Sequence, residues 1–201
     1  MTGRSSLLAK WLENGRTFLQ VILMRSWLPG YSQRELDEAQ ERYSLRFPPD
    51  LIELFLERRP ALGYSWNMED NRIREMLSWP LGMLLSDVEQ GFWWPDWGMK
   101  PHDFRERAEV VREALSVAPR LIPIIGHRFI PEAPQEAGNP VFSMYGFDTI
   151  YYGSNLAEFF SNEFQGKHEV GATRHIPFWS DLVERFDDAS AFYGTQSDSS
   201  R

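Results

Sequence analysis

The side chains best suited to proton transfer or metal binding are four histidines that lie far apart in the chain. They are His102, His127, His168 and His175. Zinc sites usually take their ligands at short, fixed spacings, as in the two histidines of HExxH. No histidine here belongs to such a motif, and the absence of cysteine excludes thiolate ligands, disulfides and cysteine catalysis. We therefore expect no metal ion and no cofactor, while a metal site built from carboxylates alone stays open.

The sequence also lacks the usual motifs of nucleophilic catalysis and of phosphate binding. Ser143 lies in VFSMY, inside a predicted strand, whereas a serine hydrolase carries GxSxG at a strand–turn–helix. No glycine-rich turn has the spacing of a dinucleotide site or a P-loop. The (D/E)xK half of a common nuclease motif fails as well, since the residues two positions before Lys10, Lys100 and Lys167 are Leu8, Gly98 and Gln165. We expect no catalytic residue, with an enzyme of unrecognised, dispersed site as an alternative.

The adjacent basic residues His127 and Arg128 are where a histidine-based active site would first be sought. They lie between two predicted strands. The simpler interpretation is structural, with one of the two paired to a carboxylate such as Asp148 at an end of the sheet. Structural ion pairs gather at such positions as well as catalytic groups do. We adopt the structural interpretation.

Acidic and aromatic residues supply the candidates for partner binding. The net charge is −8 and aromatic residues make up 14% of the chain, with eight tryptophans. An acidic surface favours a basic protein partner, although moderate negative charge also serves solubility. The tryptophans of FWWPDWG form either a binding platform or a cover over the core. The candidate partner-binding residues are Asp87, Glu89, Trp93, Trp94, Glu132 and Glu136.

Charge and hydropathy argue against two other classes of partner. Nucleic-acid binding draws on concentrated basic charge, and no basic run is present. The apolar stretch from Phe18 to Met24 contains Gln20 and is far shorter than the roughly 20 residues that span a bilayer. The N-terminus also lacks the pattern of a signal peptide. We therefore expect a cytoplasmic protein that binds neither nucleic acid nor membrane, unless a secretion system that reads another signal exports it.

The elements that must position these residues change in type along the chain. A capping box, Ser32-x-x-Glu35, begins one helix, and Pro49 suits the first turn of the next. Pro123 favours an edge strand because proline cannot donate to a ladder, and Gly146-Phe147 predicts a two-residue hairpin. Apolar periodicity predicts further helices at 71–77, 81–88, 104–115, 155–164 and 178–186, and strands at 121–125, 128–130, 141–145 and 148–152.

This order of helices, strands and helices predicts an α+β fold in a single domain, residues 29–188. Residues 1–28 are expected to form an amphipathic helical extension that packs on the domain, with docking on a membrane or partner as alternatives. Residues 189–201 are expected to be a disordered tail. The apolar stripe of the extension comprises Leu7, Leu8, Trp11, Leu12, Phe18, Leu19, Ile22 and Leu23.

Several strings in residues 31–165 resemble, in the same order, the SUKH superfamily, which includes a fungal cell-wall-synthesis regulator and many bacterial immunity proteins. The strings are LRFPPDL (45–51), FWWPDWG (92–98), LIP (121–123), GHRFIP (126–131), GNPVFSMY (138–145), Asp148, IYYG (150–153) and Glu163-Phe164. The chain departs from the family at Gly146-Phe147, where a polar pair is expected. The residues that carry the signature as a structural framework are Gly126, His127, Arg128, Pro131, Asn139, Pro140, Asp148, Tyr152 and Gly153.

The resemblance implies N-terminal helices packed on a bent, mainly antiparallel sheet, followed by C-terminal helices. It further implies a non-catalytic immunity protein, which binds and neutralises a cognate polymorphic toxin such as a nuclease. A regulatory interaction scaffold without a toxin partner is the alternative within the same family.

Overall fold

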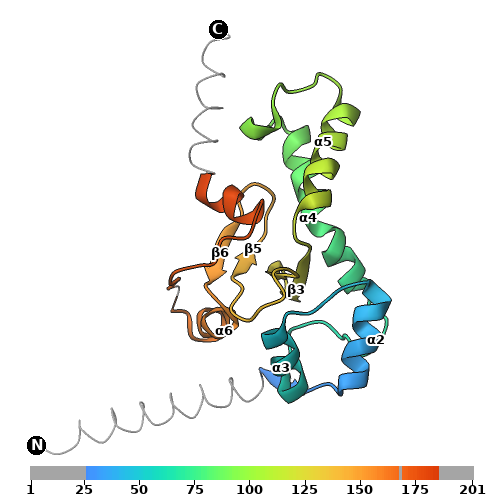
Figure 1. The fold of residues 1–201 in the computed structure, drawn as a ribbon, viewed down its shortest axis with the longest axis vertical. Helices are drawn as coiled ribbons and strands as arrows, with labels where there is room; N and C mark the ends of the chain where they lie inside the picture. The colour runs from blue at the N-terminus through green and yellow to red at the C-terminus, as the bar shows by residue number, and fades with distance from the viewer. Residues whose placement is uncertain (1–25, 168, 186–201) are drawn as a thin grey trace, which may run out of the picture.

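A computed structural model describes residues 26–167 and 169–185. It confirms the α+β class, with helices before and after an antiparallel sheet (Figure 1). The predicted tail at 189–201 and most of the predicted extension at 1–28 lie outside the described residues. The first described strand, β1 (Trp27–Pro29), takes in residues 27 and 28, so the folded domain begins earlier than expected.

The N-terminal part of the described chain consists of two helices joined to a small sheet. The capping box is confirmed: the Ser32 amide donates to the Glu35 carboxylate at 2.8 Å, and the Glu35 amide donates to the Ser32 hydroxyl at 3.3 Å. Strand β1 pairs antiparallel with a short strand that follows the second helix. The elements are α2 (Gln33–Tyr43), α3 (Pro49–Glu57) and β2 (Arg58–Pro60).

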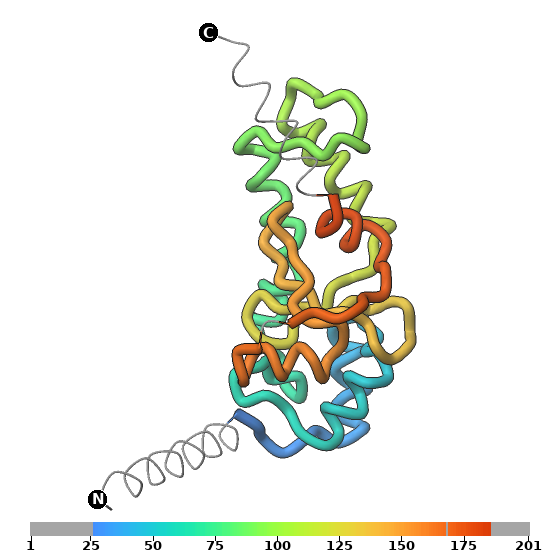
Figure 2. The backbone as a smooth tube through the Cα atoms, turned by 90° about the vertical axis from the view of Figure 1, so that its left-hand side faces the viewer, coloured from blue at the N-terminus to red at the C-terminus, as the bar shows by residue number. Residues whose placement is uncertain are grey.

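The next two helices form an antiparallel pair that extends beyond the sheet (Figures 1 and 2). The separately predicted stretches 71–77 and 81–88 form one helix, α4 (Asn71–Glu89), which continues through Pro80. Its partner is α5 (Phe104–Val117). The aromatic connection between them contains one short 3-10 turn, η1 (Pro95–Trp97).

The larger sheet has four antiparallel strands within the described residues, in the order β3-β4-β5-β6. β3 lies at an edge, which confirms the expectation from Pro123. The two-residue turn of this sheet is Gly126-His127, between β3 and β4, and Gly126 supplies the positive φ of 50°. The strands are β3 (Leu121–Ile125), β4 (Arg128–Pro131), β5 (Val141–Ser143) and β6 (Ile150–Gly153).

The predicted hairpin at Gly146-Phe147 is wrong. β5 ends at Ser143 and β6 begins at Ile150, so a longer loop joins them. The loop turns towards α4, where the Phe147 amide donates to Asp87 Oδ2 at 2.9 Å. Gly146 has a φ of 66°, and a Cβ there would lie 1.9 Å from Asp87 Oδ2. The positive φ and the short distance to the Asp87 carboxylate both favour glycine at this position.

Two apolar clusters lie on opposite faces of the larger sheet. One contains β-strand residues such as Ile130 and Val141 and packs against α2, α3 and α6 (Leu156–Gln165). The other contains their chain neighbours Phe129 and Phe142 and packs against α4, α5 and the last described helix, 179–185. Successive side chains of a strand point to opposite faces, so each short strand contributes to both clusters.

Gly153→Ala tests a close contact between the sheet and α6. A Cβ at Gly153 would lie 2.5 Å from the Phe159 backbone nitrogen, which cannot move without displacing α6. We expect a loss of about 2 kcal/mol in the free energy of unfolding, measured by urea denaturation. The control is Gly82→Ala on α4, where a Cβ would have no neighbour within 4 Å. This control should gain about 0.5 kcal/mol, because alanine is the better helix former.

Candidate binding sites

A shallow pocket of about 440 Å³ lies between the end of α4 and the β5–β6 loop. It brings together two acidic residues that are far apart in the sequence, Asp87 from α4 and Asp148 from the loop. We call it the acidic pocket. Its lining residues are Asp87, Gln90, Gly91, Phe92, Tyr145, Phe147 and Asp148.

Aromatic side chains form much of the acidic pocket. Phe92 stacks on Phe147 with ring centroids 4.1 Å apart, and Phe147 is buried. Tyr145 is 48% exposed, and Trp79 of α4 packs against it edge to face. The pocket therefore combines a fixed apolar floor with an accessible ring that can contact a partner.

The two carboxylates of the acidic pocket have no cationic partner among the described residues. Partial burial raises the pKa of Asp87, and the negative charge of Asp148 raises it further, while the hydrogen bond from Phe147 acts in the opposite direction. A lysine or arginine side chain in the pocket would compensate both charges. Its stem or guanidinium could also pack on Tyr145, as in a cation–π contact.

The other acidic candidates do not extend this pocket into one free acidic face. Glu89 is exposed at the last residue of α4. Glu132 and Glu136 follow β4 instead, and they are already paired, with Arg120 at 3.8 Å and with Arg174 at 3.1 Å. Of the four predicted carboxylates, only Asp87 and Glu89 therefore lie on α4, the helix that borders the pocket.

The placement of Trp93 and Trp94 corrects their assignment as partner contacts. Both side chains are buried, with exposed fractions of 3% and 4%. The Trp93 indole donates to the Gly98 carbonyl at 2.9 Å, and Trp94 stacks parallel to Phe147. Because Phe147 lines the acidic pocket, the Trp94 ring supports the pocket floor from inside the core, and neither tryptophan presents a surface to a partner.

Arg128 has a different carboxylate partner from the one expected. Its Nε lies 3.8 Å from Glu163 of α6, rather than near Asp148. Its guanidinium also lies over the Tyr152 ring at 3.9 Å and donates to the Ser143 hydroxyl at 3.0 Å. Arg128, which belongs to β4, thus contacts residues of β5, β6 and α6.

His127 contacts the acidic pocket through an aromatic ring. The imidazole packs edge to face on Tyr145, with centroids 5.1 Å apart. Partial burial holds the pKa of His127 below its usual value, and the neighbouring Arg128 charge lowers it further, against the opposing effect of Glu163. The turn between β3 and β4 therefore helps to orient the exposed tyrosine.

The remaining signature residues lie in the framework of the sheet. Asn139 is fully buried, donates to the Pro134 carbonyl at 2.8 Å and accepts from Arg174 at 2.7 Å. Pro131 and Pro140 are buried on either side of this segment. Asp148 differs from the other signature residues because it is exposed in the acidic pocket, which makes it a candidate for binding.

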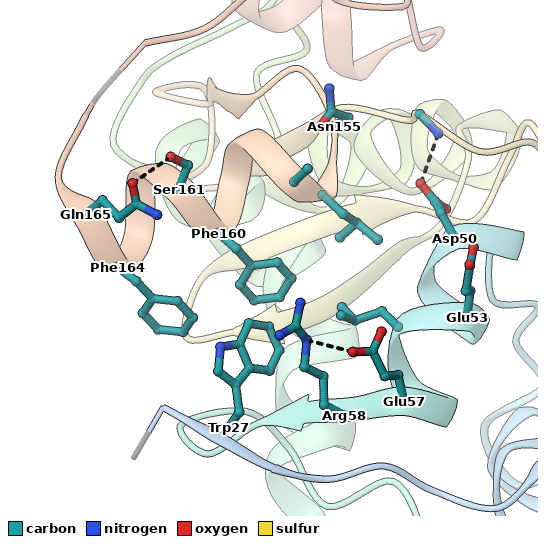
Figure 3. A pocket seen from close by; sticks show the side chains of 14 residues that line it. Trp27, Asp50, Glu53, Glu57, Arg58, Asn155, Phe160, Ser161, Phe164 and Gln165 are labelled. Carbon is teal, nitrogen blue, oxygen red and sulfur yellow. Dashed lines mark hydrogen bonds and ion pairs between the residues drawn. The ribbon is translucent and has the colours of Figure 1, made fainter. Parts of the chain in front are cut away.

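A second concave region, which sequence reasoning missed, lies between α3, β1 and α6 (Figure 3). We call this groove of about 690 Å³ the aromatic groove. One signal for it was available, since Asp50, Glu53 and Glu57 recur at helical spacing on α3. The aromatic wall could not be predicted, because Trp27 was assigned to the N-terminal extension. Its lining residues include Trp27, Asp50, Glu53, Leu54, Glu57, Arg58, Leu156, Ala157, Phe160 and Phe164.

Comparison of the chain with models of protein families, with curated proteins and with solved structures gives no match. Among the described residues, no helix is long and apolar enough to cross a membrane. The same part of the chain contains no group of three or more histidine or carboxylate side chains that could hold a metal ion.

Proposed function

We propose that this chain is a non-catalytic immunity protein, which neutralises a cognate toxin by binding it through a surface that includes the acidic pocket. The observation that carries the proposal is the pair Asp87 and Asp148, which lie together without a cationic partner among the described residues, beside the exposed ring of Tyr145. The resemblance of residues 31–165 to the SUKH superfamily supports the immunity role.

The chemistry of the acidic pocket favours a basic partner, such as a nuclease. A nuclease carries lysine and arginine side chains that contact phosphate. An acidic protein that pairs with those side chains covers the path of the nucleic acid, without any reaction of its own. A stable complex of this kind buries about 1,600 Å² in total, so the pocket would be one anchor within a larger interface. Complementary charge also speeds association and makes it sensitive to salt.

The test is co-expression with the protein encoded by the neighbouring reading frame, followed by co-purification and titration calorimetry. We expect a complex, and we expect Asp148→Lys to weaken it at least about tenfold, because a like charge then faces the partner. The control is Glu41→Lys, the same charge change at an exposed residue of α2 that does not line the pocket. Absence of a complex at micromolar concentration, or equal weakening by both variants, would contradict the proposal.

The raised pKa of Asp87 gives a separate prediction about stability. A carboxyl group whose pKa is raised by folding stabilises the folded state at acid pH, and this contribution is lost as the pH rises through the folded-state pKa. Asp87→Asn removes the charge and keeps an oxygen for the Phe147 amide, so we expect equal or higher stability at pH 7 and a smaller advantage at acid pH. Asp87→Ala should lose about 1 kcal/mol at pH 7. Urea denaturation at pH 7 and at acid pH measures the free energy of unfolding of each variant.

A further inference from the structure

The aromatic groove has an apolar wall formed by three rings. Trp27 lies against Phe160 at 4.7 Å and against Phe164 at 5.6 Å between ring centroids. Figure 3 shows these rings on one side of the groove, with the acidic side chains of α3 on the other side. Such a surface suits an amphipathic segment, which places its apolar stripe on the rings and its basic side chains on the acidic wall.

The acidic wall carries more negative than positive charge. Its three carboxylates face one guanidinium, that of Arg58, among the lining residues. Arg58 is engaged with Glu57 at 3.8 Å and with the Trp27 ring at 4.6 Å. Asp50 accepts a hydrogen bond from the Gly138 amide. Glu53 is exposed and has no ion-pair or hydrogen-bond partner among the described residues, so it is the carboxylate most available to a basic segment.

The sequence of residues 1–25 matches both walls. It carries four basic residues, Arg4, Lys10, Arg16 and Arg25, against one acidic residue, Glu13. It also carries the apolar stripe from Leu7 to Leu23. The segment joins the domain at Ser26, next to Trp27, whose ring is part of the groove. Leu23 therefore lies within about 14 Å of Trp27 along the chain.

We propose that residues 7–23 dock in the aromatic groove of their own chain, with the apolar stripe on Trp27, Phe160 and Phe164 and the basic residues facing Glu53 and Glu57. The direct connection at Ser26 gives the segment an effective concentration of about millimolar at the groove, so weak contacts are sufficient. The aromatic groove and the acidic pocket have no lining residue in common. Docking therefore does not depend on the proposed immunity role.

The test is amide hydrogen exchange on the full-length chain. We expect the amides of residues 7–23 to exchange at least about tenfold more slowly than their intrinsic rates. Two groove variants should abolish the protection: Glu53→Lys, which reverses the available charge, and Ala157→Tyr, which fills the groove from an exposed position on α6. Both sites are exposed, so exchange in the larger sheet should stay unchanged. The off-groove control is again Glu41→Lys.

A second measurement locates the segment. Lys10 is the only lysine before residue 100, and a carbodiimide should join it to Glu53 or Glu57 within one chain. Unprotected amides in the native chain would overturn the proposal, as would protection that both groove variants leave intact. Protection that falls on dilution together with a dimer would assign the groove to a second copy instead. Protection that arises only with anionic vesicles would assign the segment to a membrane.

Discussion

Trp94→Ala is expected to lower the free energy of unfolding by about 3–5 kcal/mol. The ring is 4% exposed and stacks at an interplanar angle of 9° on Phe147, which is itself buried. Alanine would leave a cavity between the α4–α5 connection and the β5–β6 loop, and neither neighbour can close it without moving a chain segment. For a chain of this size the melting temperature should fall by about 6–20 °C, measured by calorimetry.

Met99→Ala in the same connection is the control for this substitution. Met99 is 93% exposed, so its loss should change the free energy of unfolding by less than about 0.5 kcal/mol. A Trp94→Ala protein with an unchanged melting temperature and weakened partner binding would contradict the burial described here. It would restore the assignment of this ring as a partner contact.

Local patterns in the sequence predicted the parts of the fold that local physics determines. Ser32 and Glu35 satisfy each other's backbone amides within one turn, so the local sequence is enough to indicate the start of α2. Pro123 cannot donate to a ladder wherever it stands, so the edge position of β3 follows from one residue. In contrast, the burial of Trp94 depends on Phe147, which comes from a distant segment of the chain, and no periodicity shows this contact.

The candidate sites depend on contacts between distant segments. A carboxylate such as Asp148 was expected to pair with His127 or Arg128, yet the β5–β6 loop places Asp148 beside Asp87 of α4. The carboxylate beside Arg128 is instead that of Glu163, which belongs to α6, the helix that follows the sheet. The aromatic groove was missed for another reason: β1 and β2 have three residues each, which is too short for an alternating pattern to be recognised.

Arg128→Met is the second substitution from which we expect a large effect, a loss of about 3 kcal/mol in the free energy of unfolding. The side chains of Arg128 and Glu163 are 16% and 23% exposed, and Arg128 Nε is buried without a hydrogen-bond partner among the described residues. Removing the cation leaves the Glu163 carboxylate poorly solvated and uncompensated, which typically costs about 3–5 kcal/mol in buried pairs. The lower end applies here because solvent reaches part of the carboxylate.

The double variant Arg128→Met/Glu163→Leu separates this charge effect from simple loss of contacts. It should recover most of the lost stability, because two apolar side chains replace a pair that was costly to desolvate. The exposed pair Arg34–Glu38 on α2 is the control, with side-chain exposures of 87% and 44%, and its disruption should cost about 0.5 kcal/mol or less.

Partner binding per folded molecule should be retained in the double variant, since Arg128 lies outside the acidic pocket. A double variant that folds as well as the native chain but loses a measurable turnover would instead assign chemistry to Arg128, and would contradict a purely structural role for the basic pair.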